Sequence, residues 1–413
     1  MTRFGAKGDG VTDCTVAFAR AVRACAHAGG GHVVVPGGRY LTGSIHLISN
    51  VDLHVTAGAT IAFSQDPNAY LPAVFTRWEG TELYNYSPLI YAFEQHDIAV
   101  SGTGTLDGQA DNAHWWPWKG NTEDGWEPGD PHQAAARARL FAMAEQGVPV
   151  AQRVFGDGDY LRPSFVQPYR CRNVLVAGVT IVNSPMWEIH PVLSRNVLVR
   201  DVTVATHGPN NDGCNPESSK DVVIRGCTFD TGDDCIAVKS GRNADGRRVN
   251  VPSERILVEN CDFAAGHGGV TVGSEMSGGV REVYARDLRL SSPDLDTALR
   301  FKTNSVRGGF IHDVHARDIT VGTVAQAVIT IDFYYEEGPG HGFDPDVTGI
   351  TAENLTVTDA GRALNLRGYP DNPVGAIHLT NVDFHHTAQP SIVENVSGLV
   401  LTDVYENGAP MEV

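Results

Sequence analysis

The sequence has no apolar run long enough to cross a membrane, and it has few basic residues for the number of its acids. Lysine and arginine total 31, against 49 aspartate and glutamate residues, which gives a formal net charge of −18. An excess of acids disfavours non-specific binding to nucleic acid. The sequence therefore predicts neither a nucleic-acid partner nor a membrane partner, and it leaves the oligomeric state open.

Signals for export and for cysteine chemistry are also missing. The first residues, MTRFGAKGDG, lack the hydrophobic core of a signal peptide, which predicts a cytoplasmic protein, or a secreted one if a leader once preceded them. The seven cysteines are odd in number and include no C-x-x-C pair, so they favour neither a disulfide framework nor a zinc site. We expect most of them to be small buried residues.

Helix-like patterns are almost confined to two segments, TVAFARAVRACAHAG at 15–29 and HQAAARARLFAMAEQ near residue 140. In place of helices, a short phrase returns through the chain: a turn residue followed closely by a β-branched or aromatic pair. Examples are GVTIVNS at 178, DVTVATH at 201 and GCTFDTG at 226, and the phrase returns at 260, 287, 318, 354 and 381. The successive spacings are 23, 25, 34, 27, 31, 36 and 27 residues.

Repeats of this length are typical of solenoids and propellers. Short strands rich in valine and isoleucine, broken by Gly, Asn and Asp, favour an all-β fold, a single right-handed parallel β-helix with one coil per repeat. A propeller needs about 40–45 residues per blade, and an irregular β-sandwich would not carry a regular turn phrase. We expect one domain over 1–413, a capping helix at its start, and an insertion at 107–165 that shapes a cleft.

Polar residues recur late in successive coils, in steps of 21, 34, 33 and 35 residues. Neighbouring coils of a β-helix stack about 4.8 Å apart, so residues one repeat apart can be near neighbours. Asp233 and His267 each lie seven residues after the start of their own phrase, and we expect them to stack directly. The sequence thus predicts a line of chemically active side chains on one face, formed by Asp212, Asp233, Asp234, His267, Arg300, Lys302 and Tyr335.

These residue types suit the hydrolysis of a glycosidic bond. One carboxylic acid protonates the leaving oxygen, while another carboxylate activates water or attacks the sugar. Packing carboxylates together raises the pKa of one of them, because like charges cannot all ionise cheaply. Arg300 and Lys302 alternate around Phe301 and should face an anionic group such as a sugar carboxylate. Flat faces for sugar rings are offered by Trp115, Trp116, Trp118 and Trp187.

Each of these features also has a plain structural explanation. Two adjacent aspartates are usually a solvated turn, and a histidine beside glycines more often makes a structural hydrogen bond. Asn and Asp at coil corners commonly satisfy backbone amides, and the tryptophans can be packing residues. The register that the polar residues share across successive coils is what favours the functional interpretation.

Four motifs, GPNNDG, TGDDCIAVKSG, GHGGVTVGS and RFKT, resemble in order and at coil spacing the motifs N-T-D-G, G-D-D-C-I-x-K, G-H-G and R-I-K-T. Those motifs belong to glycoside hydrolase family 28, the polygalacturonase family. FGAKGDGVTDCT and NSPMWEIHP also resemble stretches of pectin-active β-helices, and the likeness runs from about residue 4 to the last coils. The resemblance implies a pectin-lyase-like solenoid. It also implies inverting hydrolysis of α-1,4-galacturonosyl linkages with no metal and no cofactor.

The resemblance also implies a role for each residue of the line. Asp233 is then the general acid, and Asp212 and Asp234 hold and activate the water. His267 supports the acids and contacts the substrate.

Substrate binding is implied for a second group of residues. Arg300 and Lys302 bind the galacturonate carboxylate, and Tyr335 matches the cleft tyrosine of the family, with Tyr334 as its rival. Further substrate-binding candidates are Trp187 and His190 in NSPMWEIHP, and Trp115 and Trp116 in the insertion.

Two departures and one open role accompany the resemblance. Asn211 stands where the family has Thr. Coil stacking places Asp212 and Asp233 roughly 5 Å apart, which by the general rule predicts retention of configuration. The family implies inversion, which we expect because three carboxylates can hold a water diagonally. Lys239 either touches the substrate or balances the acids.

The tryptophan-rich insertion and NSPMWEIHP favour a partly closed cleft, and therefore an exo-acting enzyme of bacterial type on polygalacturonate or oligogalacturonides. One alternative is a hydrolase of rhamnogalacturonan or another uronate-containing glycan. A pectate lyase is a second, which would give unsaturated products and usually require calcium. A non-catalytic glycan-binding solenoid is the third, and the intact acid cluster disfavours it.

Overall fold

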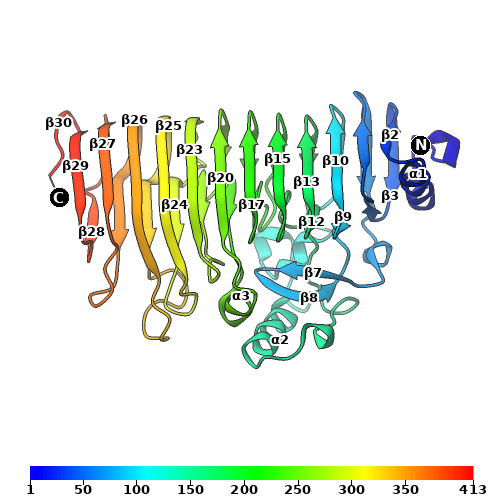
Figure 1. The fold of residues 1–413 in the computed structure, drawn as a ribbon, viewed down its shortest axis with the longest axis horizontal. Helices are drawn as coiled ribbons and strands as arrows, with labels where there is room; N and C mark the ends of the chain where they lie inside the picture. The colour runs from blue at the N-terminus through cyan, green and yellow to red at the C-terminus, as the bar shows by residue number, and fades with distance from the viewer. Residues whose placement is uncertain (413) are drawn as a thin grey trace. The chain divides into compact units, whose positions relative to one another are not determined.

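The computed structural model describes residues 1–412, which divide into two compact units, Met1–Asn215 and the residues from Pro216 onward. In both units, nearly every strand pairs in parallel with a strand one coil later in the chain (Figure 1). Each unit is therefore a run of parallel β-helix coils, as the turn phrases predicted. The prediction of one continuous domain stays a prediction.

The first unit holds most of the irregular structure. Its strands are β1 (Asp9–Asp13), β2 (Gly31–Val35), β3 (Gly38–Thr42), β4 (Ile45–His46), β5 (Val51–Val55), β6 (Ala59–Phe63), β7 (Val74–Trp78), β8 (Thr81–Asn85), β9 (Ile90–Phe93), β10 (His96–Gly102), β11 (Thr105–Asp107), β12 (Val166–Tyr169), β13 (Arg172–Ala177), β14 (Thr180–Val182), β15 (Arg195–Arg200) and β16 (Thr203–Thr206). Its helices are α1 (Thr15–His27), α2 (Ala134–Glu145) and the 3₁₀ turns η1 (Thr2–Phe4), η2 (Pro67–Tyr70), η3 (Trp116–Lys119), η4 (Thr122–Asp124) and η5 (Val150–Gln152).

The second unit is more regular. Its strands are β17 (Lys220–Arg225), β18 (Thr228–Thr231), β19 (Ile236–Val238), β20 (Ser253–Glu259), β21 (Asp262–Ala265), β22 (Val270–Val272), β23 (Val280–Leu290), β24 (Thr297–Lys302), β25 (Phe310–Asp332), β26 (Asp346–Arg367), β27 (Ile377–Phe384), β28 (Ile392–Glu394), β29 (Leu399–Glu406) and β30 (Ala409–Pro410). A short helix, α3 (Asn243–Val249), follows β19 and has no counterpart among the helices expected from sequence.

The residue that opens each repeat phrase has a left-handed backbone. These residues have φ between 52° and 77°, and they are Gly178 and Asp201 in the first unit and Gly226, Asn260, Asp287, Asp318, Asn354 and Asn381 in the second. Gly, Asn and Asp tolerate this conformation better than other residues. The phrase recurs because every coil needs the same corner, which confirms the prediction of one coil per repeat.

Apolar side chains stack inside the coils of the second unit. Ile236, Val270, Leu299 and Ile329 occupy one register position in β19, β22, β24 and β25, and all four are buried. Side chains alternate between the two faces of a strand, so the next position of each strand faces outward. The buried stack thereby fixes which residues of β22 and β24 point away from the core.

Helix α1 follows β1 in the first unit and lies against β2 to β5 (Figure 1). Its buried face is formed by Ala17, Phe18, Ala21 and Val22, which recur at the spacing of an amphipathic helix. The helix covers apolar side chains at the start of the coil stack, as the predicted capping helix would.

The predicted insertion is present between β11 and β12, where η3, η4, α2 and η5 replace the coil strands. Its helix α2 packs beside an antiparallel hairpin formed by β7 and β8 (Figure 1). Trp78, Leu83, Leu140 and Phe155 share a small apolar core there. The insertion is thus a packed subdomain of the first unit.

The cysteines agree with the expectation that most of them are small buried residues. Six of the seven cysteines are buried and all seven are free thiols, so they fill space in the coils. Among residues 1–412, no helix is both long and apolar enough to cross a membrane.

Replacing Phe229 tests the contribution of coil stacking to stability. Its ring is fully buried and stacks on Phe263 of the next coil, with centroids 5.7 Å apart and planes 17° apart. Phe229→Ala is expected to lower the free energy of unfolding in urea by about 3–5 kcal/mol, because it leaves a cavity between coils. Phe4→Ala, at a partly exposed position, is the control and should cost about 1 kcal/mol or less. Equal losses for the two variants would contradict the stacked core.

Candidate active site

Asp233 and Asp234 lie in the second unit, at the bend between β18 and β19. The Thr231 hydroxyl donates to the Asp233 carbonyl at 2.8 Å, and the Asp234 N–H donates to Asp233 Oδ1 at 2.9 Å. These bonds hold the chain in a tight corner before Ile236 starts the next strand. Two adjacent acids can therefore serve one site, because the alternation of a strand does not apply to them.

Asp233 and His267 stack in neighbouring coils, which confirms the register predicted from their equal offsets. The backbone N–H of His267 donates to the backbone carbonyl of Asp233 at 3.1 Å. The ring atom Nδ1 of His267 lies 3.0 Å from the carboxylate atom Oδ1 of Asp233. The Asp233 side chain is 18% exposed and the His267 side chain is 51% exposed. The pair is therefore positioned at a surface that a substrate can reach.

The glycines on either side of His267 leave room for this arrangement. Gly266 has φ +145°, and a Cβ there would lie 2.5 Å from the Asp233 carbonyl oxygen. A Cβ on Gly268 would lie 3.0 Å from Asp234 Oδ1 and 3.2 Å from the Arg300 Cβ. The G-H-G motif thus lets one coil pass closely over the acids of the coil before it.

Asp234 is the buried member of the pair, with 1% of its side chain exposed. Its Oδ2 accepts a hydrogen bond from Lys302 Nζ at 2.6 Å, and its Oδ1 accepts from Arg300 Nη1 at 3.2 Å. The Thr271 hydroxyl also donates to Oδ1, at 3.0 Å. Thr271 and Arg300 share one register position in β22 and β24, so this contact follows from the coil register, although Thr271 was not predicted.

The charges around the acids work against the pKa rise expected from packed carboxylates. Burial alone would raise the pKa of Asp234, but Lys302 and Arg300 outweigh it and hold the pKa below its usual value. Burial is likewise opposed at Asp233 by the hydrogen bond and charge of His267, which lower the pKa of that carboxyl. The same hydrogen bond raises the pKa of His267. The expected rise is therefore wrong for this pair, because nearby cations offset the like charges.

Tyr335 faces the cations, which decides between the two candidate tyrosines. Lys302 Nζ lies 5.3 Å and the Arg300 guanidinium carbon 6.0 Å from the centroid of the Tyr335 ring. The Tyr334 ring instead packs against Tyr369, with centroids 5.2 Å apart, and under Arg367. Tyr335 also lines a cavity of about 400 Å³ together with Arg300 and Lys302. Of the two tyrosines, Tyr335 is thus the one that shares a cavity with Arg300 and Lys302.

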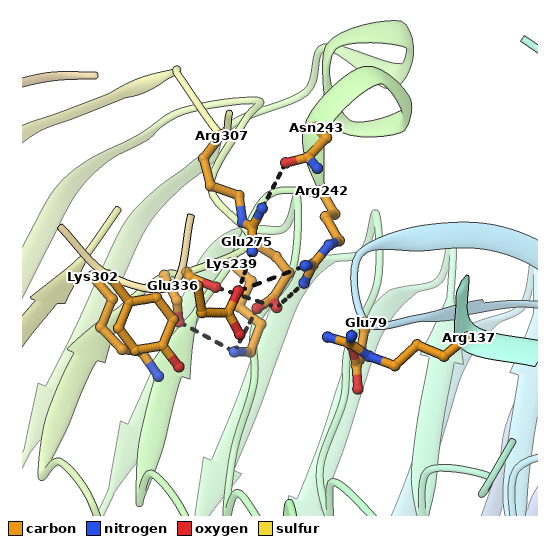
Figure 2. Close-up of polar contacts among 12 residues, drawn as sticks. Glu79, Arg137, Lys239, Arg242, Asn243, Glu275, Lys302, Arg307 and Glu336 are labelled. Carbon is orange, nitrogen blue, oxygen red and sulfur yellow. Dashed lines mark hydrogen bonds and ion pairs between the residues drawn. The ribbon is translucent and has the colours of Figure 1, made fainter. Parts of the chain in front are cut away.

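Lys239 belongs to a buried ion cluster beside these acids, and its positive charge also helps to lower the pKa of Asp233 and Asp234. Its Nζ lies 3.0 Å from Glu275 Oε2 and donates to the Gly273 carbonyl at 3.2 Å. Glu275 Oε1 also accepts from Arg242 at 3.3 Å, and Figure 2 shows Lys239 and Arg242 both directed at Glu275. The cations hold the pKa of Glu275 well below its usual value, although burial would raise it. Lys239 therefore has a structural partner of its own.

The ion cluster continues to the loop that carries Tyr335. Arg307 is fully buried and pairs with Glu336 at 2.6 Å and with Glu337 at 3.3 Å. It also donates to Asn243 Oδ1 at 2.8 Å (Figure 2). Asn304 donates to the Tyr335 carbonyl at 2.9 Å. These contacts hold the chain at Tyr335 and at the two residues that follow it, a role that no sequence motif indicated.

Asp212 lies in the first unit, in a turn that Asn211 organises. Asn211 Oδ1 accepts from the Thr206 hydroxyl at 2.6 Å and from the Gly208 N–H at 2.7 Å, and its Nδ2 donates to the Ser184 carbonyl at 3.1 Å. Asn at this position thus braces the turn more extensively than the usual Thr hydroxyl could. Asp212 Oδ2 accepts from Asn215 at 2.9 Å, and its predicted place beside Asp233 stays a prediction.

Most of the predicted aromatic sugar contacts are buried in the first unit. Trp115 packs against Tyr70 and Trp118, Trp187 lies in the apolar core beside α2, and His190 is fully buried against the Trp187 ring. This burial argues against their contacting a sugar directly, because their ring faces are already covered. The predicted contact therefore stays without structural support. Trp116 is half-buried, and its Nε1 donates to the Ser184 carbonyl at 2.9 Å.

Known proteins resemble this chain over most of its length. Residues 156–402 match the family model for glycosyl hydrolases family 28, and residues 1–59 match one described as "Rhamnogalacturonase A/epimerase, pectate lyase-like". A probable polygalacturonase from Vitis vinifera is 30% identical over 406 residues, which cover 94% of this chain and 74% of that protein. An exo-poly-alpha-D-galacturonosidase from Dickeya chrysanthemi is 28% identical over 391 residues, which cover 87% of this chain and 62% of that protein.

Solved structures give the same picture. The exopolygalacturonase of Thermotoga maritima superposes with a TM-score of 0.97 at 48% identity, over 100% of this chain and 92% of that one. A family 28 exopolygalacturonase from Yersinia enterocolitica has a TM-score of 0.77 at 22% identity, over 100% of this chain and 76% of that one, and that likeness shows the fold alone. The chain is a glycoside hydrolase and belongs to glycosyl hydrolases family 28.

Proposed function

We propose that the protein hydrolyses α-1,4-galacturonosyl linkages and removes sugars from the ends of galacturonan chains. One observation supports this most strongly: Arg300 and Lys302 converge on Asp234 and open onto the same cavity. Two cations at a site that already holds an ionised acid suit a substrate that brings its own carboxylate. The exo mode is supported by the exo-acting activities for which the Dickeya and Thermotoga relatives are named.

Substrate binding would raise the pKa of Asp234. In the free protein, its carboxylate is held by Lys302 and Arg300. A uronate that binds these two cations shares them with Asp234, which raises the affinity of Asp234 for a proton. The same step that recognises the sugar carboxylate would therefore make Asp234 a better acceptor for a proton of the attacking water.

The proton for the leaving oxygen would come from the Asp233–His267 pair. Its hydrogen bond holds one proton between imidazole and carboxylate, and Asp233 delivers a proton as the glycosidic C–O bond breaks. Water forms the new bond to the sugar carbon, and its proton goes to the carboxylate that activates it, Asp234 or Asp212. The family resemblance assigns Asp212 this share of the work.

Another uronate-containing glycan, such as rhamnogalacturonan, is the second candidate substrate. The match of residues 1–59 to a family model that includes rhamnogalacturonase A supports this second substrate. Cleavage of rhamnogalacturonan fragments without cleavage of homogalacturonides would replace the first proposal with this one.

Product analysis on defined tetragalacturonide tests substrate and mode together. We expect monomer and trimer from the first time points, because an exo-acting site takes one sugar from a chain end. Separation of the products by chromatography measures this. Asp233→Asn is expected to lower the rate at least about 10²-fold, which also separates an enzyme from a binding protein. An early ladder of intermediate oligomers from long polygalacturonate, with little monomer, would contradict the exo mode.

The stereochemical outcome tests the water-activating arrangement. We expect the first product formed to have the inverted β configuration at its anomeric carbon, because water attacks the face opposite the leaving group. Proton NMR of early reaction mixtures reads this before the sugar mutarotates. An α product would indicate a covalent intermediate on one of the aspartates and would overturn the inverting mechanism.

The pH dependence should follow the proton that His267 holds. Because Asp233 raises the pKa of His267 above 6.5, the pair keeps its proton to a higher pH than a free histidine. We expect kcat/KM to fall as the pH rises through this raised pKa. His267→Gln keeps a hydrogen-bond donor but has no titrating proton. It should therefore lower kcat/KM about 10²-fold and abolish the fall of kcat/KM at high pH. His378→Gln, on an exposed strand position, is the control. An unchanged profile in His267→Gln would contradict the role.

A further inference from the structure

Two rows of side chains run outward along one face of the second unit from the cations that hold Asp234. One row continues from Arg300 through Thr330 of β25 to Asn365 of β26. The other continues from Lys302 through Asp332 to Arg367 at the equivalent positions. Since successive coils are about 4.8 Å apart, Asn365 and Arg367 lie about 10 Å along the coil stack from the first pair of cations.

Both rows and Arg362 line the cavity of about 400 Å³ that Tyr335 also borders. Arg362 lies on β26, the strand that also carries Asn365 and Arg367, and it pairs in register with Ala327 of β25. The far end of this cavity therefore belongs to β26, away from the catalytic acids. Only its near end, at Arg300 and Lys302, has a role in the proposed reaction.

Arg362 differs from the other cations of this cavity. Its guanidinium donates to the Gln389 side-chain oxygen and, at 3.1 Å, to the Pro390 carbonyl. Both acceptors are neutral, and among residues 1–412 no carboxylate lies within ion-pair distance of Arg362. Arg367, in contrast, is paired with Glu394 at 3.2 Å and packs on Tyr334. The Arg362 side chain is thus positioned by two neutral acceptors, and among residues 1–412 no acid compensates its charge.

Asn365 adds an unmet hydrogen-bond acceptor to the wall of the same cavity. Its Oδ1 is buried and has no hydrogen-bond partner in the described chain. Buried acceptors are rarely left without a donor in a folded protein, and an unmet one in a cavity wall points to a ligand. The nearest acid in the rows, Asp332, accepts the Tyr334 N–H at 2.9 Å and lies between Lys302 and Arg367.

We propose that Arg362 and Asn365 form a second uronate subsite, which binds a sugar further along the bound chain than the one held by Arg300 and Lys302. Arg362 takes the carboxylate of that sugar, and Asn365 Oδ1 accepts a hydrogen bond from one of its hydroxyl groups. This inference rests on the proposed function, because it names where the rest of the same anionic glycan lies. It predicts that the enzyme prefers substrates long enough to reach β26.

The test compares di- and tetragalacturonide on wild type and on Arg362→Gln. A digalacturonide has only two sugars. It is therefore too short to reach from the uronate site at Arg300 and Lys302 to the second one at Arg362. We expect Arg362→Gln to lower the ratio of kcat/KM for the tetramer to kcat/KM for the dimer about tenfold, through KM. Asn365→Leu should lower the ratio in the same direction, and Arg362→Lys should restore part of it. Calorimetric titration of the same oligomers into Asp233→Asn and Asp233→Asn/Arg362→Gln reads binding without turnover.

Arg317→Gln is the matched control, because Arg317 is exposed on β25 and pairs with its neighbour Asp318 at 3.8 Å. It should leave the ratio unchanged, and thermal unfolding checks that all variants are folded. If wild type cleaves the oligomers but Arg362→Gln keeps the wild-type ratio, the subsite is wrong and the proposed function stands. If wild type neither binds nor cleaves any galacturonide, the proposed function fails and the subsite fails with it.

Discussion

The buried carboxylate of Asp234 is the constraint on which the site depends. A charge with almost no exposed surface is tolerated only if it is paired and hydrogen-bonded, and Lys302, Arg300 and Thr271 meet this need. Removing one partner of such a pair typically costs about 3–5 kcal/mol, because a buried charge is left uncompensated. The cations proposed to recognise an anionic sugar are therefore also the groups that let an ionised acid exist in the coil wall.

The register between successive coils places these side chains around Asp234. Buried Leu299 and Phe301 fix the orientation of β24, and Arg300 and Lys302 then face outward together. Glycine at 268 lets the coil of His267 approach Asp234 closely. The ion cluster around Glu275 and Arg307 has a separate role, since its charged contacts anchor the loop of Tyr335.

The sequence predicted what depends on coil spacing and missed what depends on side-chain surroundings. Equal offsets placed His267 on Asp233 because the corner of every coil is the same. The partner of Lys239 could not be predicted, because Glu275 lies in a loop outside the repeat phrase. Trp187 was taken for a sugar contact, since a flat apolar ring suits packing and sugars equally well. The β7–β8 hairpin had one local signal, the Glu79-Gly80 turn with two positive φ angles.

The bond from Asp234 to Arg300 and Lys302 has a consequence for how the coils hold together. In a solenoid, stability comes mainly from contacts between adjacent repeats, so each coil can open with only its neighbours affected. Asp234 precedes β19, while Arg300 and Lys302 belong to β24, with β22 between them in the ladder. This ion pair therefore links next-nearest coils across an intervening one. Three coils become one cooperative unit at the place where the chemistry requires their relative positions to stay fixed.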